Sequence, residues 1–232
     1  MRLHIQEVKK SFGSKEVLRG ANAVVEQGMV TALLGRNGAG KTTLFSLIAG
    51  EKQRDGGEIL LEEEGILRPL ALEDVFFMVA EPQLPNFLTG REMIEFFIGA
   101  NREKIHDPQP ADVYFDQIAF DEDDRDRLIQ GYSTGMKNKL QMLMFMILRP
   151  KVILMDEPLT SLDVVVQHEM KVLIRSIHSE HIILFSTHIL QLAKDLCDDV
   201  LLLREGIILP VNQDLQDPDA EEQIIRLLRE EE

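Results

Sequence analysis

The sequence predicts an α/β protein built on a mainly parallel core sheet. Residues 30–34, 152–155 and 182–185 are continuous apolar runs, as expected for strands buried on both faces. A helix is expected between the last two, from about 164 to 178, and another begins at Gly40-Lys41, directly after the first. Buried strands that alternate with helices are typical of a parallel sheet covered on both faces.

The N-terminal segments have a different pattern. Leu3, Ile5 and Val8 alternate loosely with polar residues and Val24-Val25 is a β-branched pair, so both segments are strand-like. The helix that starts at Gly40-Lys41 carries apolar residues at helical spacing up to residue 48, with Gly50 as its expected C-cap. A turn is expected at Gly56-Gly57, before a short strand at 58–61.

The middle of the chain, about residues 90–131, reads as helical. Residues 91–98 carry apolar residues at helical spacing, and the charge run 121–127 is typical of a solvated helix face. A longer helix is expected at 134–148. The tail, 217–232, has the pattern of an acidic amphipathic helix.

Composition and charge exclude several classes of protein. Of 232 residues, 44% are hydrophobic and 28% charged, which allows a sizeable core. The formal net charge is −15 and the pI is about 4.8. A nucleic-acid-binding surface usually requires a basic patch, so we expect no nucleic-acid partner, and no electrostatic binding to anionic lipid.

Three observations indicate a cytoplasmic protein. No stretch approaches the roughly 18 to 20 apolar residues that span a bilayer, because the richest run, 142–148, stops at Arg149-Pro150. The N-terminal residues lack the apolar core of a secretory signal. Cys197 is the only cysteine, so no intrachain disulfide can form.

The strongest motif is Gly35-Arg36-Asn37-Gly38-Ala39-Gly40-Lys41-Thr42, which matches the phosphate-binding P-loop between a strand and a helix. Glycines let successive backbone N–H groups point at phosphate oxygens, and the helix N-terminus adds partial positive charge. Lys41 is expected to reach the β- and γ-phosphates, and the Thr42 hydroxyl to bind Mg²⁺. The expected nucleotide-binding residues here are Gly35, Asn37, Gly38, Ala39, Gly40, Lys41, Thr42 and Thr43.

A second motif ends the strand at 152–155 with Asp156-Glu157-Pro158. Ligands of α/β proteins collect at the carboxyl ends of parallel strands. We expect Asp156 to hold Mg²⁺ directly or through water, and Glu157 to polarise the attacking water as a general base. The motifs therefore predict Mg-ATP as the bound nucleotide.

The segment Tyr132-Ser133-Thr134-Gly135-Met136-Lys137 resembles the signature of ATP-binding cassette proteins, and the chain resembles their nucleotide-binding domain over nearly its whole length. The commoner form of the signature has Gly at 134 and Gln at 136. The version in this chain looks like the exporter branch that handles drugs, antibiotics or peptides.

The resemblance implies the fold of the ATP-binding cassette ATPases within the P-loop NTPases. Residues 1–232 would form one ATPase domain with an N-terminal antiparallel β part. Its core would comprise residues 1–89 and 132–216, with an inserted α-helical subdomain at 90–131 and the acidic helix at 217–232.

The resemblance also implies site residues. Ser133 and Gly135 would face the γ-phosphate of ATP held by a second copy, and Asp163 would lie in the loop, 161–163, that passes between the two active sites. His188, after the strand at 182–185, resembles the switch histidine that contacts the γ-phosphate, and Phe12 resembles the aromatic residue on which adenine stacks. The implied catalytic groups are Glu157, His188 and Lys41.

The implied assembly is a homodimer, or a pseudo-dimer with a related ATPase subunit, enclosing two Mg-ATP. An integral membrane permease subunit would be a separate chain, and this chain would lie on the inner face of the cell membrane through it. The expected contact groove comprises Met78, Phe87 and the segment after Thr89.

One position departs from the family pattern. In the family, a glutamine usually approaches magnesium and the lytic water. The corresponding position in this chain is Ala80, whose side chain offers no ligand oxygen. Glu81 or Gln83 would substitute only with a shifted loop. Slow hydrolysis or altered coupling to the partner is therefore an open alternative.

Three other functions are considered. A cassette protein that acts outside transport usually has two cassettes, a coiled-coil insertion or basic arms, none of which occurs here. A nucleotide-sensing module without hydrolysis is favoured only by Ala80 and Thr134, and phosphate release separates it from an ATPase. The segment at 132–137, followed by Asp156-Glu157 at this spacing, argues against a different P-loop enzyme such as a kinase.

Overall fold

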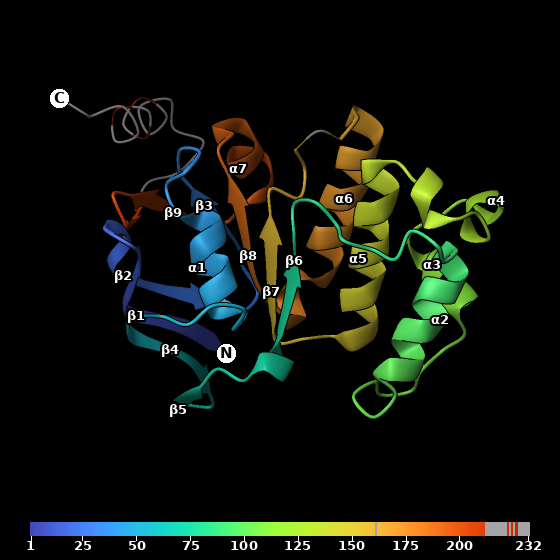
Figure 1. Ribbon diagram of the computed structural model, residues 1–232, viewed down its shortest axis with the longest axis horizontal. Helices are drawn as coiled ribbons and strands as arrows, with labels where there is room; N and C mark the ends of the chain where they lie inside the picture. Colours follow the sequence, from blue (N-terminus) through green and yellow to red (C-terminus); the bar gives the residue numbers. More distant parts are fainter. Residues whose placement is uncertain (161, 212–221, 223, 225, 227–232) are drawn as a thin grey trace. The chain divides into compact units, whose positions relative to one another are not determined.

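The computed structural model describes residues 1–160, 162–211, 222, 224 and 226 (Figure 1). Internal contacts divide the chain into two compact units. The sheet unit comprises Met1–Phe77, Lys151–Glu157 and Ile177–Glu232, and the helical unit comprises Met78–Pro150 and Pro158–Ser176. The predicted helical insertion, 90–131, lies within the helical unit, which also takes in α5 (Thr134–Leu148).

The sheet unit contains an antiparallel sheet with the strand order β2-β1-β4-β5. Its strands are β1 (Arg2–Phe12), β2 (Lys15–Glu26), β4 (Gly56–Glu63) and β5 (Ile66–Pro69). The antiparallel N-terminal part is thus present. The turn predicted at Gly56-Gly57 is wrong, because β4 already begins at Gly56, which pairs with Lys9 of β1.

The second sheet has the order β10-β9-β3-β8-β7-β6. Its strands are β3 (Val30–Leu34), β6 (Val75–Met78), β7 (Val152–Asp156), β8 (Ile182–Thr187), β9 (Asp199–Arg204) and β10 (Ile207–Pro210). Strand β3 pairs in parallel with β8 and β9, β7 pairs in parallel with β8, and β10 is antiparallel to β9. The predicted mainly parallel core sheet is confirmed.

A single apolar cluster joins the two sheets to α1 (Lys41–Ile48). Leu44, Phe45, Leu47 and Ile48 of α1 pack among buried residues from both sheets. Burying apolar surface in this way is the main favourable contribution to folding. The turn that precedes α1 is therefore fixed between a buried strand and a buried helix.

Several shorter elements complete the sheet unit. They are η1 (Leu72–Asp74), η3 (His178–Glu180) and α7 (Leu190–Leu196). Helix α7, β9 and β10 were not predicted, although the apolar run of β9 is a strand signal. The helix predicted at 217–232 lies outside the described residues except for positions 222, 224 and 226.

The helical unit begins its first helix with a capping box. In α2 (Gly90–Ala100), the Glu92 amide donates to Thr89 Oγ1 at 3.1 Å and the Thr89 amide donates to Glu92 Oε2 at 2.8 Å. The other helices are α3 (Ala111–Gln117), α4 (Glu122–Arg125), η2 (Ile129–Gly131), α5 and α6 (Val164–Ile177). The helix predicted at 134–148 is confirmed as α5, which ends where Arg149 adopts a left-handed conformation before Pro150.

An arginine–aspartate network holds α2, α3 and α4 together. Arg91 donates to Asp112 Oδ1 at 2.7 Å and to Asp126 Oδ1 at 2.7 Å. The buried Arg125 donates to Asp112 Oδ1 at 3.0 Å and to Asp116 Oδ1 at 2.7 Å. Hydrogen bonds from Arg91 lower the pKa of both Asp112 and Asp126.

Among the described residues, no helix combines the length and apolar character that crossing a bilayer requires.

The network predicts acid sensitivity. A carboxylate whose pKa is depressed by folding adds stability above its unfolded pKa, about 3.9, and this stability is lost as the pH falls through the folded value. We expect Arg91→Met to narrow the gap between the unfolding temperatures at about pH 7 and about pH 3. Thermal unfolding followed by circular dichroism measures this, with Arg102→Met, an exposed position, as the control. An unchanged gap in Arg91→Met would contradict the role of the network.

Candidate functional site

The turn between β3 and α1 is closed by its own lysine. Gly40 has φ 108° at the N-cap of α1, a conformation that a side chain would strain. The buried Lys41 side chain curls back, so that Nζ donates to the Gly35 carbonyl at 2.8 Å and to the Arg36 carbonyl at 3.4 Å. The ammonium group is thus held inside the turn of a strand–turn–helix unit, which is the context that a P-loop requires.

Two carboxylates lie at the end of β7 next to this turn, Asp156 as its last residue and Glu157 directly after it. The Thr42 hydroxyl donates to Asp156 Oδ2 at 2.7 Å. Asp156 is buried, whereas Glu157 is partly exposed and has φ 50°. Glu157 Oε1 lies 3.5 Å from Lys41 Nζ and 3.0 Å from His188 Nδ1. Five residues from three separate segments of the chain are therefore linked by contacts at hydrogen-bonding or ion-pair distance.

Ser186 belongs to the same cluster and was missed in the sequence. Its hydroxyl donates to Asp156 Oδ1 and accepts a hydrogen bond from the Glu157 amide at 3.1 Å. Ser186 is fully buried and pairs with Asp156 across the parallel strands β7 and β8. Its place two residues before His188, at the end of a buried strand, is the signal that could have identified it.

The oxygen atoms of Thr42 and Asp156 fit Mg²⁺. Magnesium takes oxygen ligands and is usually bound through one or two carboxylates together with substrate phosphates and water. Within the described part of the chain, no group of three or more His, Cys, Asp or Glu side chains could hold a metal alone. Thr42 and Asp156 thus offer two oxygen atoms of the kind that Mg²⁺ takes, and a magnesium site at these residues stays a prediction.

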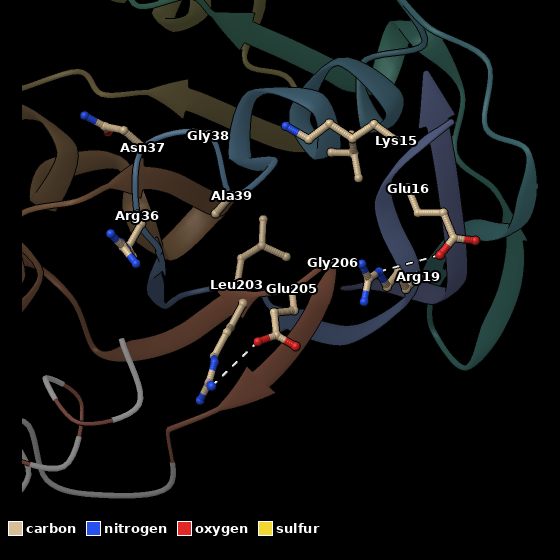
Figure 2. Close-up of a pocket in the computed structure, with 12 residues that line it drawn as sticks. Lys15, Glu16, Arg19, Arg36, Asn37, Gly38, Ala39, Leu203, Glu205 and Gly206 are labelled. Carbon is tan, nitrogen blue, oxygen red and sulfur yellow. Dashed lines mark ion pairs between the residues drawn. The ribbon is translucent and has the colours of Figure 1, made fainter. Parts of the chain in front are cut away.

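A cavity of about 340 Å³ opens beside the turn, as Figure 2 shows. Its walls come from the β1–β2 hairpin, the turn itself and the β9–β10 hairpin. The lining residues are Lys15, Glu16, Val17, Arg19, Arg36, Asn37, Gly38, Ala39, Leu203, Arg204, Glu205 and Gly206. The cavity continues from the turn and is of a size for the part of a nucleotide beyond its phosphates.

Phe12 is at the end of β1 and outside the residues that line this cavity. Its side chain is 47% exposed, and Lys10 Nζ lies 5.4 Å from the ring centroid. One face of the ring is thus engaged by a cation. Stacking of adenine on Phe12 stays a prediction.

The remaining predicted residues lie in the helical unit. Ser133 caps α5, because its Oγ accepts a hydrogen bond from the Met136 amide at 3.2 Å, and Gly135 is buried in the first turn. Asp163 caps α6, since Oδ1 accepts hydrogen bonds from the amides of Val165 and Val166 at 3.0 Å each. Both residues have a structural role of their own, and Ser161 lies outside the described residues.

The segment that carries the substituted glutamine position is also in the helical unit. Ala80 is exposed, and Gln83 Nε2 donates to the Glu81 carbonyl at 3.4 Å. Glu81 and Gln83 line a small pocket of about 270 Å³ together with Thr134 and Lys137.

The predicted contact groove is corrected in one respect. Met78 is buried and presents no surface to a partner, whereas Phe87 is 78% exposed.

Residues 18–160 match a protein-family model described as ABC transporter. An uncharacterised ABC transporter ATP-binding protein from Bacillus subtilis is 30% identical over 89% of this chain and 67% of its own length. A lantibiotic transport ATP-binding protein from Streptococcus pyogenes is 29% identical over 89% of each chain. An Fe(3+) ion import ATP-binding protein from Escherichia coli O157:H7 is 29% identical over 92% of this chain and 63% of its own length.

A solved structure described as the ATP binding subunit of an ABC transporter matches with a TM-score of 0.78 at 22% identity. The match covers 97% of this chain and all of that one. The predicted fold class is confirmed by this likeness.

The Ser186 contacts predict a measurable stability effect. Ser186→Ala leaves a buried carboxylate oxygen and a backbone N–H without these partners, which costs about 1–3 kcal/mol. Chemical denaturation should show this loss, whereas Ser14→Ala, in an exposed turn, should leave the free energy of unfolding unchanged. Equal stability of the two variants would show that the hydroxyl does not hold the two acidic residues.

Proposed function

Because the chain belongs to the ABC transporter family and is an ATP-hydrolysing, ATP-binding subunit of that family, we propose that two copies close around two Mg-ATP and drive a separate membrane-spanning subunit. The carrying observation is the cluster of Lys41, Glu157 and His188, in which Glu157 Oε1 is 3.5 Å from the ammonium group and 3.0 Å from the imidazole.

The turn supplies the binding energy for the phosphates. Its backbone N–H groups and the N-terminus of α1 attract negative charge. Lys41 exchanges its bonds to the Gly35 and Arg36 carbonyls for bonds to the β- and γ-phosphate oxygens, and Asn37 lies beside them. Thr42 and Asp156 would hold Mg²⁺, which would neutralise developing phosphate charge.

Hydrolysis then requires one proton acceptor. Glu157 orients a water molecule in line with the bond between the γ-phosphorus and the bridging oxygen and takes its proton. That bond breaks as the water oxygen attaches to phosphorus, and ADP leaves with the bridging oxygen. His188 Nδ1 lies 3.0 Å from Glu157 Oε1 and keeps this carboxylate in place, and its second ring nitrogen would contact the γ-phosphate.

A second copy completes the enclosure in this proposal. Ser133 and Gly135 present the N-terminus of α5 to the γ-phosphate held by the other copy, and Asp163 lies in the loop between the two sites. Adenine stacks on the exposed ring of Phe12. Most of the rate enhancement comes from positioning and charge stabilisation.

The membrane partner is proposed to contact the helical unit near Phe87 and the segment after Thr89. A large exposed aromatic side chain is a typical interface anchor. The Tyr-Ser-Thr-Gly-Met-Lys form of residues 132–137 favours export. The relatives include one named for lantibiotic transport and one named for Fe(3+) import, both at 29% identity. This chain would lie peripherally at the inner face of the membrane.

The roles predict the behaviour of Glu157→Gln, which preserves shape but removes the proton acceptor. ATP turnover should fall about 100-fold or more, while ATP binding persists and sedimentation shows a dimer with Mg-ATP. Glu58→Gln, an exposed position on β4, serves as the matched control.

Turnover at the wild-type rate in Glu157→Gln would show that Glu157 is not the base. If the unmodified protein binds Mg-ATP and dimerises without releasing phosphate, the nucleotide-sensing alternative takes its place.

A further inference from the structure

The signature segment Ser133–Gly135 is bracketed by one guanidinium group. Arg127 Nη2 donates to the Gly131 carbonyl at 3.0 Å, on the N-terminal side of the segment. The same nitrogen lies 3.4 Å from Met136 Sδ, on the C-terminal side. A single planar group thus contacts Gly131 and Met136, which lie on either side of the two residues, Ser133 and Gly135, that the proposed function assigns to phosphate.

Two further contacts orient the plane of this guanidinium. Nη1 lies 2.6 Å from Asp124 Oδ1, and Cζ lies 5.6 Å from the centroid of the Tyr132 ring. The Arg127 side chain is 48% exposed, so the ion pair alone adds little stability. Its importance lies in geometry, because stacking and the hydrogen bonds together allow few orientations.

Tyr132 provides a rigid support for this stack. Its side chain is buried, and its hydroxyl donates to the Asp124 carbonyl at 2.5 Å. Its ring centroid lies 5.8 Å from the ring centroid of Phe120. Gly90 allows the approach, because a Cβ at that position would lie 2.2 Å from the hydroxyl oxygen. Burial raises the pKa of Tyr132 to about 12.

The start of α5 lies between the two residues that Arg127 Nη2 contacts, Gly131 and Met136. Ser133 Oγ accepts from the Met136 amide and the Ser133 carbonyl accepts from the Lys137 amide at 3.0 Å. The amides of the first helical turn that have no intrahelical acceptor are the groups a phosphate would meet. A shift of the loop by about 1 Å would misalign them, which costs catalysis heavily.

We propose that Arg127, stacked on Tyr132, is a positioning residue that presets the Ser133–Gly135 segment for the phosphate of a second copy's nucleotide. The proposal rests on the proposed function for its consequence in turnover. Its structural part concerns the nucleotide-free chain alone. Arg127 itself does not touch the nucleotide.

The first test needs no nucleotide. In Arg127→Ala, hydrogen–deuterium exchange at the amides of Met136 and Lys137 should become about tenfold faster, while exchange along α2 stays at the wild-type rate. Tyr132→Phe, which keeps the ring and loses the hydroxyl, should give a smaller change in the same direction. Arg102→Ala, at an exposed position of the same unit, is the matched control.

The second test separates positioning from general damage. In Arg127→Ala, kcat for ATP hydrolysis should fall about tenfold or more. The affinity of the turn before α1 for a non-hydrolysable ATP analogue should stay within about twofold of the wild-type value. Arg127→Lys should restore the wild-type unfolding temperature without restoring kcat, because an ammonium group cannot stack and bridge as the planar guanidinium does.

Unchanged exchange at Met136 and Lys137, or wild-type kcat in Arg127→Ala, would overturn the proposal. The two proposals fail differently. If the wild-type protein shows no Mg-ATP turnover, the proposed function falls, and exchange in the nucleotide-free protein still decides whether Arg127 orders the segment.

Discussion

The parallel pairing of β3, β8 and β7 brings the turn before α1, the acidic pair and His188 to one edge of the sheet. Leu34 pairs with Thr187 and Asp156 pairs with Ser186, so the three strands end at one edge of the sheet. The turn, the acidic pair and the histidine each follow one of these strand ends. Because the strands are fully buried, a slip in register would move apolar side chains and site residues together.

The polar groups at this edge satisfy one another. Asp156 accepts hydrogen bonds from two hydroxyls, and Lys41 donates to two backbone carbonyls. A buried charge without such partners would be costly, so the cluster is stable before any ligand arrives. In the proposed function, binding of a nucleotide would exchange these internal partners for phosphate and magnesium without rebuilding the scaffold.

Much of this arrangement could be predicted from the sequence because its signals are local. The P-loop pattern lies between an apolar strand and a helix of the expected period, and α5 follows from its own apolar pattern. Arg127 carries no such local signal, because its partners come from a folded loop. Ser186 is marked only by its place at the end of a buried strand, and its partner Asp156 comes from a distant strand. The burial of Met78 likewise depends on tertiary packing that its own segment does not reveal.

The central claim is that the turn before α1 binds the phosphates of Mg-ATP through Lys41. Isothermal titration calorimetry of the wild-type protein with ATP tests it most directly. ATP is titrated once in the presence of magnesium and once with a chelator that removes the magnesium. The account predicts binding tighter than about 1 mM that weakens without magnesium and is lost in Lys41→Ala. Absence of binding by the wild type, or equal binding by Lys41→Ala, would contradict it.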